Sequence, residues 1–223
     1  MIIVTGGAGF IGSNFILKFL EASNENLLNL DNLSYAANLS NLKTIDSDPR
    51  YSFSKINIQN QSEVEEIVKE VKPRAILNFA AESHVDRSIE GPESFINTNI
   101  LGTYSLLEAA LNYWNDLDES GKKIFRFFHI STDEVFGSLD INDKKSTEES
   151  SYKPNSPYSA SKAASDHLVR AWHHTFKLPT LVSNCTNNYG PHQHEEKLIP
   201  LIITKALKND DLPIYGDGKN IRD

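Results

Sequence analysis

The sequence predicts an α/β fold, in which a doubly wound parallel β-sheet carries helices on both faces and is followed by the start of a smaller C-terminal lobe. Short apolar runs alternate with longer segments whose apolar residues recur three and four positions apart. A glycine-rich turn directly follows the first apolar run. The residue composition changes after Asn184, where Asn, Gly, Pro and His residues cluster. Alternation of this kind is typical of a parallel sheet covered on both sides.

Short apolar runs give the predicted strands, and segments of helical periodicity give the predicted helices. The strands are residues 2–5, 27–31, 51–57, 75–79, 125–131 and 180–184. The helices are residues 11–22, 62–71, 93–113, 158–176 and 198–207. A capping box from Ser62 to Glu65 is predicted to open the second helix, and Pro73 follows its end. The polar stretch 139–157 predicts an exposed loop that could lie over a site.

Composition narrows the class of protein. The 223 residues are 39% hydrophobic and 23% charged, so the chain can form a core. We expect a main domain at 1–184 and part of a second lobe at 185–223, in a chain that stops without completing an element. The net charge of −8 disfavours a nucleic-acid partner. Apolar runs too short for a membrane span and no visible secretory signal predict a cytoplasmic protein without a membrane partner.

The glycine-rich turn at residues 5–12 reads TGGAGFIG and joins a predicted strand to a predicted helix. Small residues there allow a tight turn and let backbone amides approach a pyrophosphate at the helix N-terminus. Asp31 ends the second strand, where its carboxylate can accept hydrogen bonds from a ribose diol. The same carboxylate would repel a 2′-phosphate, so NAD is favoured over NADP. The pattern predicts a Rossmann-like dinucleotide site, and the alternative is a glycine turn without a ligand.

Two polar motifs predict acid–base chemistry beside that site. Tyr158 and Lys162 are four positions apart on one predicted helix, so both can point into one cleft. A neighbouring cation favours the phenolate, and we expect Lys162 to lower the pKa of Tyr158. Thr132, Asp133 and Glu134 follow the fifth strand, at the sheet edge where ligands bind. Two adjacent carboxyl groups can divide into an acid and a base, although a solvated loop with an acidic cap would read the same way.

Six motifs together resemble the extended short-chain dehydrogenase/reductases that act on nucleotide sugars, and among them the dehydratases of dTDP-glucose. These motifs are residues 5–12, 80–88 (AAESHVDRS), 98–103 (TNILGT), 131–137 (STDEVFG), 158–162 (YSASK) and 184–191 (NCTNNYGP). The adjacent Asp133 and Glu134 are the most telling feature, since related epimerases generally lack both acids. The resemblance runs over the whole chain. Family members continue beyond Asp223, and they carry Asp and Tyr where this chain has Asn57 and Phe136.

The resemblance implies the conversion of dTDP-glucose to dTDP-4-keto-6-deoxyglucose, with NAD as cofactor and a homodimer as the assembly. Thr132 would bond the sugar 4-hydroxyl, Tyr158 would take its proton, and Lys162 would hold the nicotinamide ribose. Asp133 would protonate the departing 6-hydroxyl, and Glu134 would remove the C5 proton. The hydride taken from C4 would return to C6, so that NAD is regenerated in each cycle.

The resemblance also implies the binding residues. Those for the cofactor are Gly6, Gly9, Phe10, Ile11, Gly12, Asp31, Asn32, Leu33, Ser34, Asn57, Ile58, Ala80, Ala81, Ser83, Thr98, Tyr158, Lys162 and Asn188. Those for the nucleotide sugar are Glu82, Ser83, Thr132, Asn187, Lys197, Leu198, Pro213, Ile214, Tyr215 and Arg222.

Other functions remain as alternatives. A UDP-sugar epimerase or decarboxylase could use the same scaffold, and so could an NAD-binding scaffold without turnover. The sequence does not decide between dTDP and UDP as the nucleotide. No metal site is predicted, because the His-rich residues 192–196 lack the spacing of a ligand set, and the single cysteine, Cys185, excludes a multi-cysteine site. A serine hydrolase is not supported, since no G-x-S-x-G motif occurs.

Overall fold

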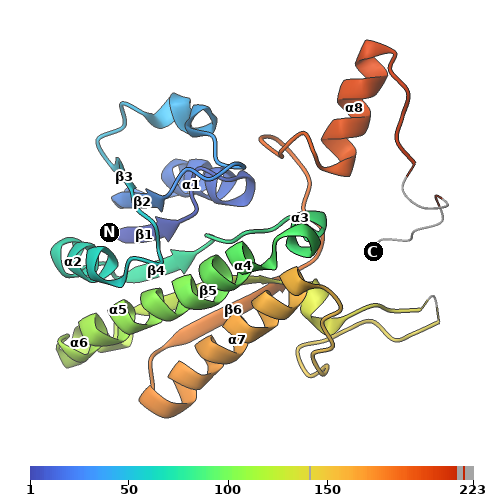
Figure 1. Ribbon diagram of the computed structural model, residues 1–223. Helices are drawn as coiled ribbons and strands as arrows, with labels where there is room; N and C mark the ends of the chain where they lie inside the picture. The colour runs from blue at the N-terminus through green and yellow to red at the C-terminus, as the bar shows by residue number, and fades with distance from the viewer. Residues whose placement is uncertain (141, 215–217, 219–223) are drawn as a thin grey trace.

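The computed structural model describes residues 1–140, 142–214 and 218. Within these residues, six parallel strands form one sheet in the order β3-β2-β1-β4-β5-β6 (Figure 1). The strands are β1 (Ile2–Thr5), β2 (Leu27–Asp31), β3 (Tyr51–Lys55), β4 (Ala75–Asn78), β5 (Arg126–Thr132) and β6 (Thr180–Cys185). The order runs outward in both directions from β1 and β4, which is the doubly wound Rossmann arrangement. The predicted fold class is confirmed.

Helices cover both faces of the sheet (Figure 1). On one face α2 (Gln61–Val71), α5 (Thr103–Asn115) and α7 (Pro157–Phe176) lie side by side, and on the other α1 (Phe10–Ala22) packs with η1 (Leu39–Ile45). The remaining short helices are α3 (Val85–Glu90), α6 (Glu119–Ile124) and η3 (Asp133–Phe136). None of η1, α3, α6 and η3 was predicted, because segments of four to seven residues show too little periodicity.

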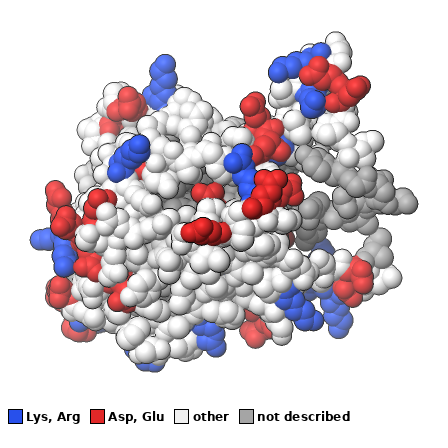
Figure 2. Space-filling model, in the orientation of Figure 1, with Lys and Arg blue, Asp and Glu red and all other residues white. Residues whose placement is uncertain are grey.

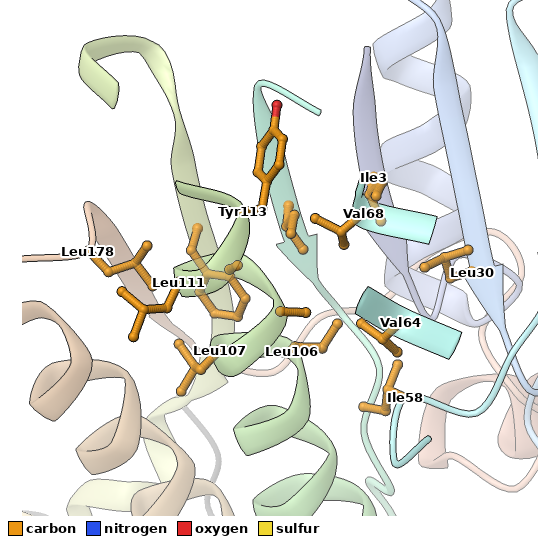
Figure 3. Close-up of a cluster of buried hydrophobic side chains, with 14 of the residues drawn as sticks. Ile3, Leu30, Ile58, Val64, Val68, Leu106, Leu107, Leu111, Tyr113 and Leu178 are labelled. Atoms are coloured by element: carbon orange, nitrogen blue, oxygen red, sulfur yellow. The ribbon is translucent and has the colours of Figure 1, made fainter. Parts of the chain in front are cut away.

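Strand β1 shows how the sequence divides its apolar residues between two cores. Ile3 packs with Ile76 and Leu106 in the cluster beneath α2 and α5, part of which Figure 3 shows. Its neighbours Ile2 and Val4 pack on the opposite face, in the cluster beneath α1. Successive side chains of a strand point to opposite faces, so an unbroken apolar run supplies both cores. This explains why the central strands read as continuous hydrophobic segments.

The predicted helix at 93–113 is interrupted. It consists of α4 (Pro92–Phe95), the π-helical segment η2 (Ile96–Gly102) and α5. The wide turn brings Asn99 inward, where its Nδ2 donates to Ser161 Oγ (2.8 Å) and to Glu82 O (3.0 Å). Its Oδ1 accepts from Glu82 N (2.9 Å). Asn99 therefore fastens η2 to α7 and to the loop after β4.

The start of α2 differs from the prediction. The helix begins at Gln61 after Asn60, and Ser62 donates from Oγ to Asn60 Oδ1 (2.9 Å) instead of capping a backbone amide. A capping box does occur at α7, where Ser156 and Ser159 exchange side-chain and backbone hydrogen bonds. The predicted box at Ser62 is wrong because the residue lies inside the first turn of α2, one position past its first residue.

The C-terminal part of the described chain stands away from the sheet. After β6 the chain leads to α8 (Leu198–Lys208), which projects from the body in Figure 1. All of α8 is described, and none of its residues is buried. In the predicted loop at 139–157, the described residues before α7 are largely exposed, but none of them lines the cavity discussed below. None of the described helices combines the length and the apolar character that a membrane crossing needs.

Candidate active site

A cavity of about 300 Å³ lies at the carboxyl ends of the strands. The sheet order reverses between β1 and β4, and this switch point is where ligands bind in open α/β sheets. The glycine turn forms one wall, and η3 with the start of α7 forms another. The segment 185–197 contributes a third wall. One cavity therefore joins the predicted cofactor motif to the predicted acid–base motifs.

Two side chains of β2 hold the glycine turn in shape. Asn29 Oδ1 accepts from Gly7 N (3.1 Å), and Asp31 Oδ2 accepts from Ala8 N (2.9 Å). The other oxygen of Asp31 accepts from Leu33 N (2.8 Å). Burial raises the pKa of Asp31, and its two backbone donors oppose that rise. Strand β2 thus fixes the turn and places an acidic group beside it.

The turn leaves no room for larger side chains. Gly6 has a φ of +70°, and a Cβ there would lie 2.6 Å from Ala80 N. A Cβ on Gly12 would lie 2.3 Å from Gly6 O. The first helical hydrogen bond of α1 runs from Ser13 N to Gly9 O (2.9 Å), so the amides of residues 10–12 lie in the unpaired first turn. A close backbone approach and a helix N-terminus are the features that fit a dinucleotide pyrophosphate.

The predicted acid–base residues meet in this cavity. Thr132 caps η3, with Oγ1 accepting from Glu134 N (3.2 Å) and donating to Asp133 Oδ1 (3.2 Å). Thr132 also lies close enough to Tyr158 to favour its ionised form. Burial and the nearby Glu134 raise the pKa of Tyr158, and Thr132 opposes that rise. The expected lowering of the Tyr158 pKa by Lys162 is wrong, because the effect of burial dominates.

Lys162 is buried and lies against the sheet. Its Nζ donates to Ile130 O (2.8 Å) and lies 3.4 Å from His129 Nε2. Burial lowers the pKa of Lys162 to about 8, while Asp166 acts in the opposite direction. Lys162 is part of α7, and its ammonium is anchored to β5 where Lys162 lines the cavity.

Segments far apart in the sequence meet beside the cavity. Glu196 Oε2 lies 3.5 Å from Arg87 Nη2 and 3.8 Å from His84 Nε2. The Arg87 guanidinium lies 3.8 Å from the centroid of the Tyr35 ring. Burial and Glu196 raise the pKa of Tyr35 to about 12. The contacts of Glu196 tie the segment 185–197 to the start of α3. In the described chain no three His, Cys, Asp or Glu side chains are grouped to hold a metal ion.

Most predicted site residues line the cavity. They are Gly6, Gly9, Phe10, Ile11, Gly12, Asp31, Asn32, Ser34, Ile58, Ala80, Ala81, Glu82, Ser83, Thr98, Thr132, Asp133, Glu134, Tyr158, Lys162, Asn187, Asn188 and Lys197. Their individual roles remain predictions.

The other predicted binding residues lie elsewhere. Leu33 adopts a left-handed backbone conformation with a φ of +58°, outside the lining. Asn57 uses its Oδ1 to accept from Gln59 N (3.0 Å), within its own turn. Leu198 begins α8, and the segment 213–214 follows that helix, also outside the lining. Tyr215 and Arg222 lie outside the described residues.

The cavity also has lining residues that sequence reasoning missed. Some lie at or just past strand ends, where the position alone could have indicated them: Leu30, Ile56, Phe79, Ile130, Ser131 and Cys185. Others lie on loops without any periodic signal: Ala36, Ala37, Thr186, Gln193, His194 and Glu196.

Comparisons with known proteins agree with this geometry. The profile of the GDP-mannose 4,6-dehydratase family matches residues 3–223. A dTDP-glucose 4,6-dehydratase of Haemophilus influenzae is 54% identical over 222 residues, which cover 100% of this chain and 66% of that protein. One of Xanthomonas campestris is 55% identical over 221 residues, covering 99% of this chain and 62% of that protein. The chain therefore spans less than two thirds of the length of these curated relatives.

A solved structure extends the comparison to the fold. The dTDP-glucose 4,6-dehydratase DesIV from Streptomyces venezuelae, with NAD and TYD bound, superposes with a TM-score of 0.91 at 45% identity. The match covers 99% of this chain and 66% of that one.

Proposed function

Because this chain belongs to the GDP-mannose 4,6-dehydratase family, we propose that it is the cofactor-binding and catalytic part of an NAD-dependent enzyme that converts dTDP-glucose to dTDP-4-keto-6-deoxyglucose. One observation carries the proposal. The pair Tyr158 and Lys162 and the triplet at 132–134 line a single cavity with the glycine turn. A dehydratase needs both an oxidation pair and an elimination pair, and this cavity holds both. Relatives that are 52–55% identical bear this activity in their names.

Tyr158 and Thr132 would act on the sugar 4-hydroxyl. The Tyr158 phenolate would accept the hydroxyl proton, and Thr132, which acts to lower the pKa of Tyr158, supports this ionised form. Lys162 enters the cavity from α7, with its ammonium anchored to Ile130 O of β5, and would hold the cofactor ribose beside Tyr158. Its positive charge favours the phenolate once a ligand has displaced water from the cavity.

Asp133 and Glu134 would carry out the elimination. The C4 ketone makes the C5 proton acidic, and the Glu134 carboxylate would remove it. Asp133 would donate a proton to the C6 hydroxyl, which leaves as water. Thr132 connects the elimination pair to the oxidation pair. It hydrogen-bonds Asp133 and the Glu134 amide, and it also acts on Tyr158. It would therefore keep oxidation and elimination centred on neighbouring carbons of one sugar.

The cofactor that fits this cavity is NAD. When bound, NAD would accept the hydride from C4 and supply it to C6, while a proton returns to C5 and completes the product. The amides of residues 10–12 would hold the pyrophosphate at the start of α1. Asp31 would accept hydrogen bonds from the adenosine ribose, in addition to its bonds from Ala8 and Leu33.

Isotope labelling tests the proposed reaction. The protein is incubated with NAD and with dTDP-glucose that carries deuterium at C4. We expect a product lighter than the substrate by one water, with the deuterium at C6. Unchanged mass would indicate epimerisation, and no conversion of dTDP-glucose or UDP-glucose despite NAD binding would indicate a scaffold without turnover. A parallel incubation with UDP-glucuronate tests decarboxylation, which releases carbon dioxide. Each of these other outcomes would overturn the proposal.

The proposal includes a homodimer formed through α5 and α7. Figure 2 shows the area over these helices as largely uncharged. Leu101 is 50% exposed and Phe176 is 45% exposed on this face. The rings of Tyr104 and Trp172 pack together, and Trp172 also contacts Phe176, so the apolar surface is continuous. An apolar area of this kind is typical of an interface between protein chains.

We also infer that residues 185–223 begin a substrate lobe. The exposed α8 and the cavity wall at 186–197 support this division. The nucleotide sugar would lie between this lobe and the main domain at 1–184. The single cysteine is consistent with a cytoplasmic location. The net charge of −8 argues against a nucleic-acid partner, because nucleic-acid phosphates are negatively charged as well.

A further inference from the structure

The catalytic face of α7 continues into a third polar residue. Asp166 follows Lys162 by the same four positions that separate Tyr158 from Lys162, so all three lie on one helix face. Asp166 is only 4% exposed. A buried carboxylate is costly unless its surroundings compensate the charge.

Donors from three elements compensate Asp166. Its Oδ2 accepts from Ser131 Oγ (2.8 Å), from Tyr152 OH (2.9 Å) and from Asn184 Nδ2 (3.3 Å). Burial alone would raise the pKa of Asp166, but His129 together with the nearby charge of Lys162 and the Ser131 bond outweighs burial and lowers it. Asp166 is therefore an anion at neutral pH.

The other carboxylate oxygen faces His129. Asp166 Oδ1 lies 3.4 Å from His129 Nε2, and the same nitrogen lies 3.4 Å from Lys162 Nζ. Burial lowers the pKa of His129 to about 4, so the ring is neutral. Thr5 donates to Asn78 Oδ1 (2.7 Å), which turns Asn78 Nδ2 toward His129 Nδ1 (3.1 Å). The ring proton is therefore on Nε2, which lies 3.2 Å from Ser165 Oγ and 3.4 Å from Asp166 Oδ1.

We propose that Asp166 is the fixed counter-charge that keeps the Lys162 ammonium charged inside the cavity, with neutral His129 packed between the two groups. Neither Asp166 nor His129 lines the cavity, so both are positioning residues. Opposite charges interact strongly away from water, and Lys162 is 3% exposed. The proposal rests on the proposed function only where Lys162 is taken to bind the cofactor.

The other groups around Lys162 do not supply this charge. Its direct acceptor, Ile130 O, is a neutral carbonyl. Cys185 at the end of β6 acts on Lys162 less than Asp166 does, and Tyr158 is a phenol whose pKa is raised. The two acids of η3, at 133 and 134, affect Tyr158, whereas Asp166 is the carboxylate that acts on Lys162. The segment η2 meets α7 through uncharged side chains.

Direct titration of Lys162 tests the proposal without any ligand. The protein is labelled with ¹³C at the lysine Cε, and the Lys162 signal is identified by its loss in Lys162→Met. We expect Asp166→Asn to lower the titration midpoint of Lys162 by about one to three pH units, the effect of a nearby opposite charge. Asp166→Glu should largely restore the wild-type midpoint. An unchanged midpoint in Asp166→Asn would overturn the proposal.

His129→Gln is the matched control, because it disturbs the same buried network without removing a charge. We expect it to move the Lys162 midpoint much less than Asp166→Asn does, and an equal shift would overturn the assignment of Asp166. Should Asp166→Asn fail to fold, the wild-type protein still decides. The Asp166 carboxyl carbon must report an ionised group throughout the range from neutral pH to the Lys162 midpoint, and a protonated Asp166 there would refute the counter-charge.

The pH dependence of NAD affinity tests whether the Asp166 counter-charge on Lys162 matters for cofactor binding. Affinity should fall as pH rises through the Lys162 midpoint, because the ammonium then loses its charge. In Asp166→Asn the fall should move to lower pH by the shift that the titration measures, and a fall at the wild-type pH would count against the proposal. Absence of NAD binding in the wild-type protein would overturn the proposed function alone, since the Lys162 titration does not depend on NAD.

Discussion

Replacing Gly12 by alanine tests the close packing of the glycine turn. The added Cβ would lie 2.3 Å from Gly6 O and 2.8 Å from Gly7 Cα. Both are backbone atoms, and ordinary contacts begin near 3.4 Å. Part of the turn must therefore move by about an ångström, away from the geometry that aims the α1 amides at a pyrophosphate.

The magnitude follows from this clash. Overpacking of a tight contact costs roughly 1–3 kcal/mol of folding stability. For a chain of this size each kcal/mol lowers Tm by about 2–4 °C. We expect NAD affinity to fall by at least about tenfold, which corresponds to roughly 1.4 kcal/mol of binding free energy. Calorimetry measures Tm, and fluorescence titration measures the dissociation constant.

A second glycine variant is the matched control. At Gly91 an added Cβ would approach no closer than 3.9 Å, to Arg87 O, and the residue has a negative φ of −146°. Gly91→Ala should therefore leave both Tm and NAD affinity close to those of the wild type. If Gly12→Ala also retained both values, the inference that this turn must pack without a side chain would be refuted.

Four further variants test separate parts of the account. Glu134→Gln should still oxidise C4, seen as absorbance at 340 nm on mixing with NAD and dTDP-glucose, but lose at least about 100-fold in product formation; normal turnover would disprove its role as base. Asp31→Ala should weaken NAD binding and reduce the preference for NAD over NADP in competition titrations, and an unchanged ratio would contradict the ribose assignment. His129 has a pKa of about 4 in the folded protein, against an ordinary value of 6.5. Between these two pH values the unfolded chain binds a proton that the folded protein does not. The free energy of unfolding should therefore fall as the pH drops from about 6.5 to about 4, by an amount on the order of 3 kcal/mol. Denaturant unfolding should show this slope in the wild type and a flatter one in His129→Gln, and parallel slopes would refute it. Leu101→Glu should halve the mass seen by light scattering, and a retained dimer would exclude this face as the interface.

Strands and the glycine turn could be predicted because their signals are local. The run at 2–5 is apolar throughout, since β1 is buried on both faces, and the spacing from Gly12 to Asp31 reflects one strand–helix–strand unit. The π-helical segment η2 could not be predicted, because apolar residues continue through it at helical spacing. Its cause is the set of hydrogen bonds that Asn99 makes with residues distant in sequence.

The electrostatics of the site depended on contacts that no spacing reveals. The four-residue interval from Tyr158 to Lys162 correctly placed both side chains at one cavity. It could not show that Lys162 Nζ would be bound to Ile130 O, or that burial would raise the pKa of Tyr158. The contacts of Glu196 with Arg87 and His84 join segments about 110 positions apart, so no local sequence pattern could indicate them.

The wide turn of η2 has a consequence for helix phase. An α-helix advances about 100° per residue, so one surplus residue in a turn rotates everything after it by about that angle. Phe95, before the turn, contacts the ring of Tyr158, whereas Leu106 and Leu107, after it, pack in the core beneath α2 and α5. Deleting a single residue within 96–102 would bring the two halves back into step, and one of them would then present the wrong side chains to its neighbour.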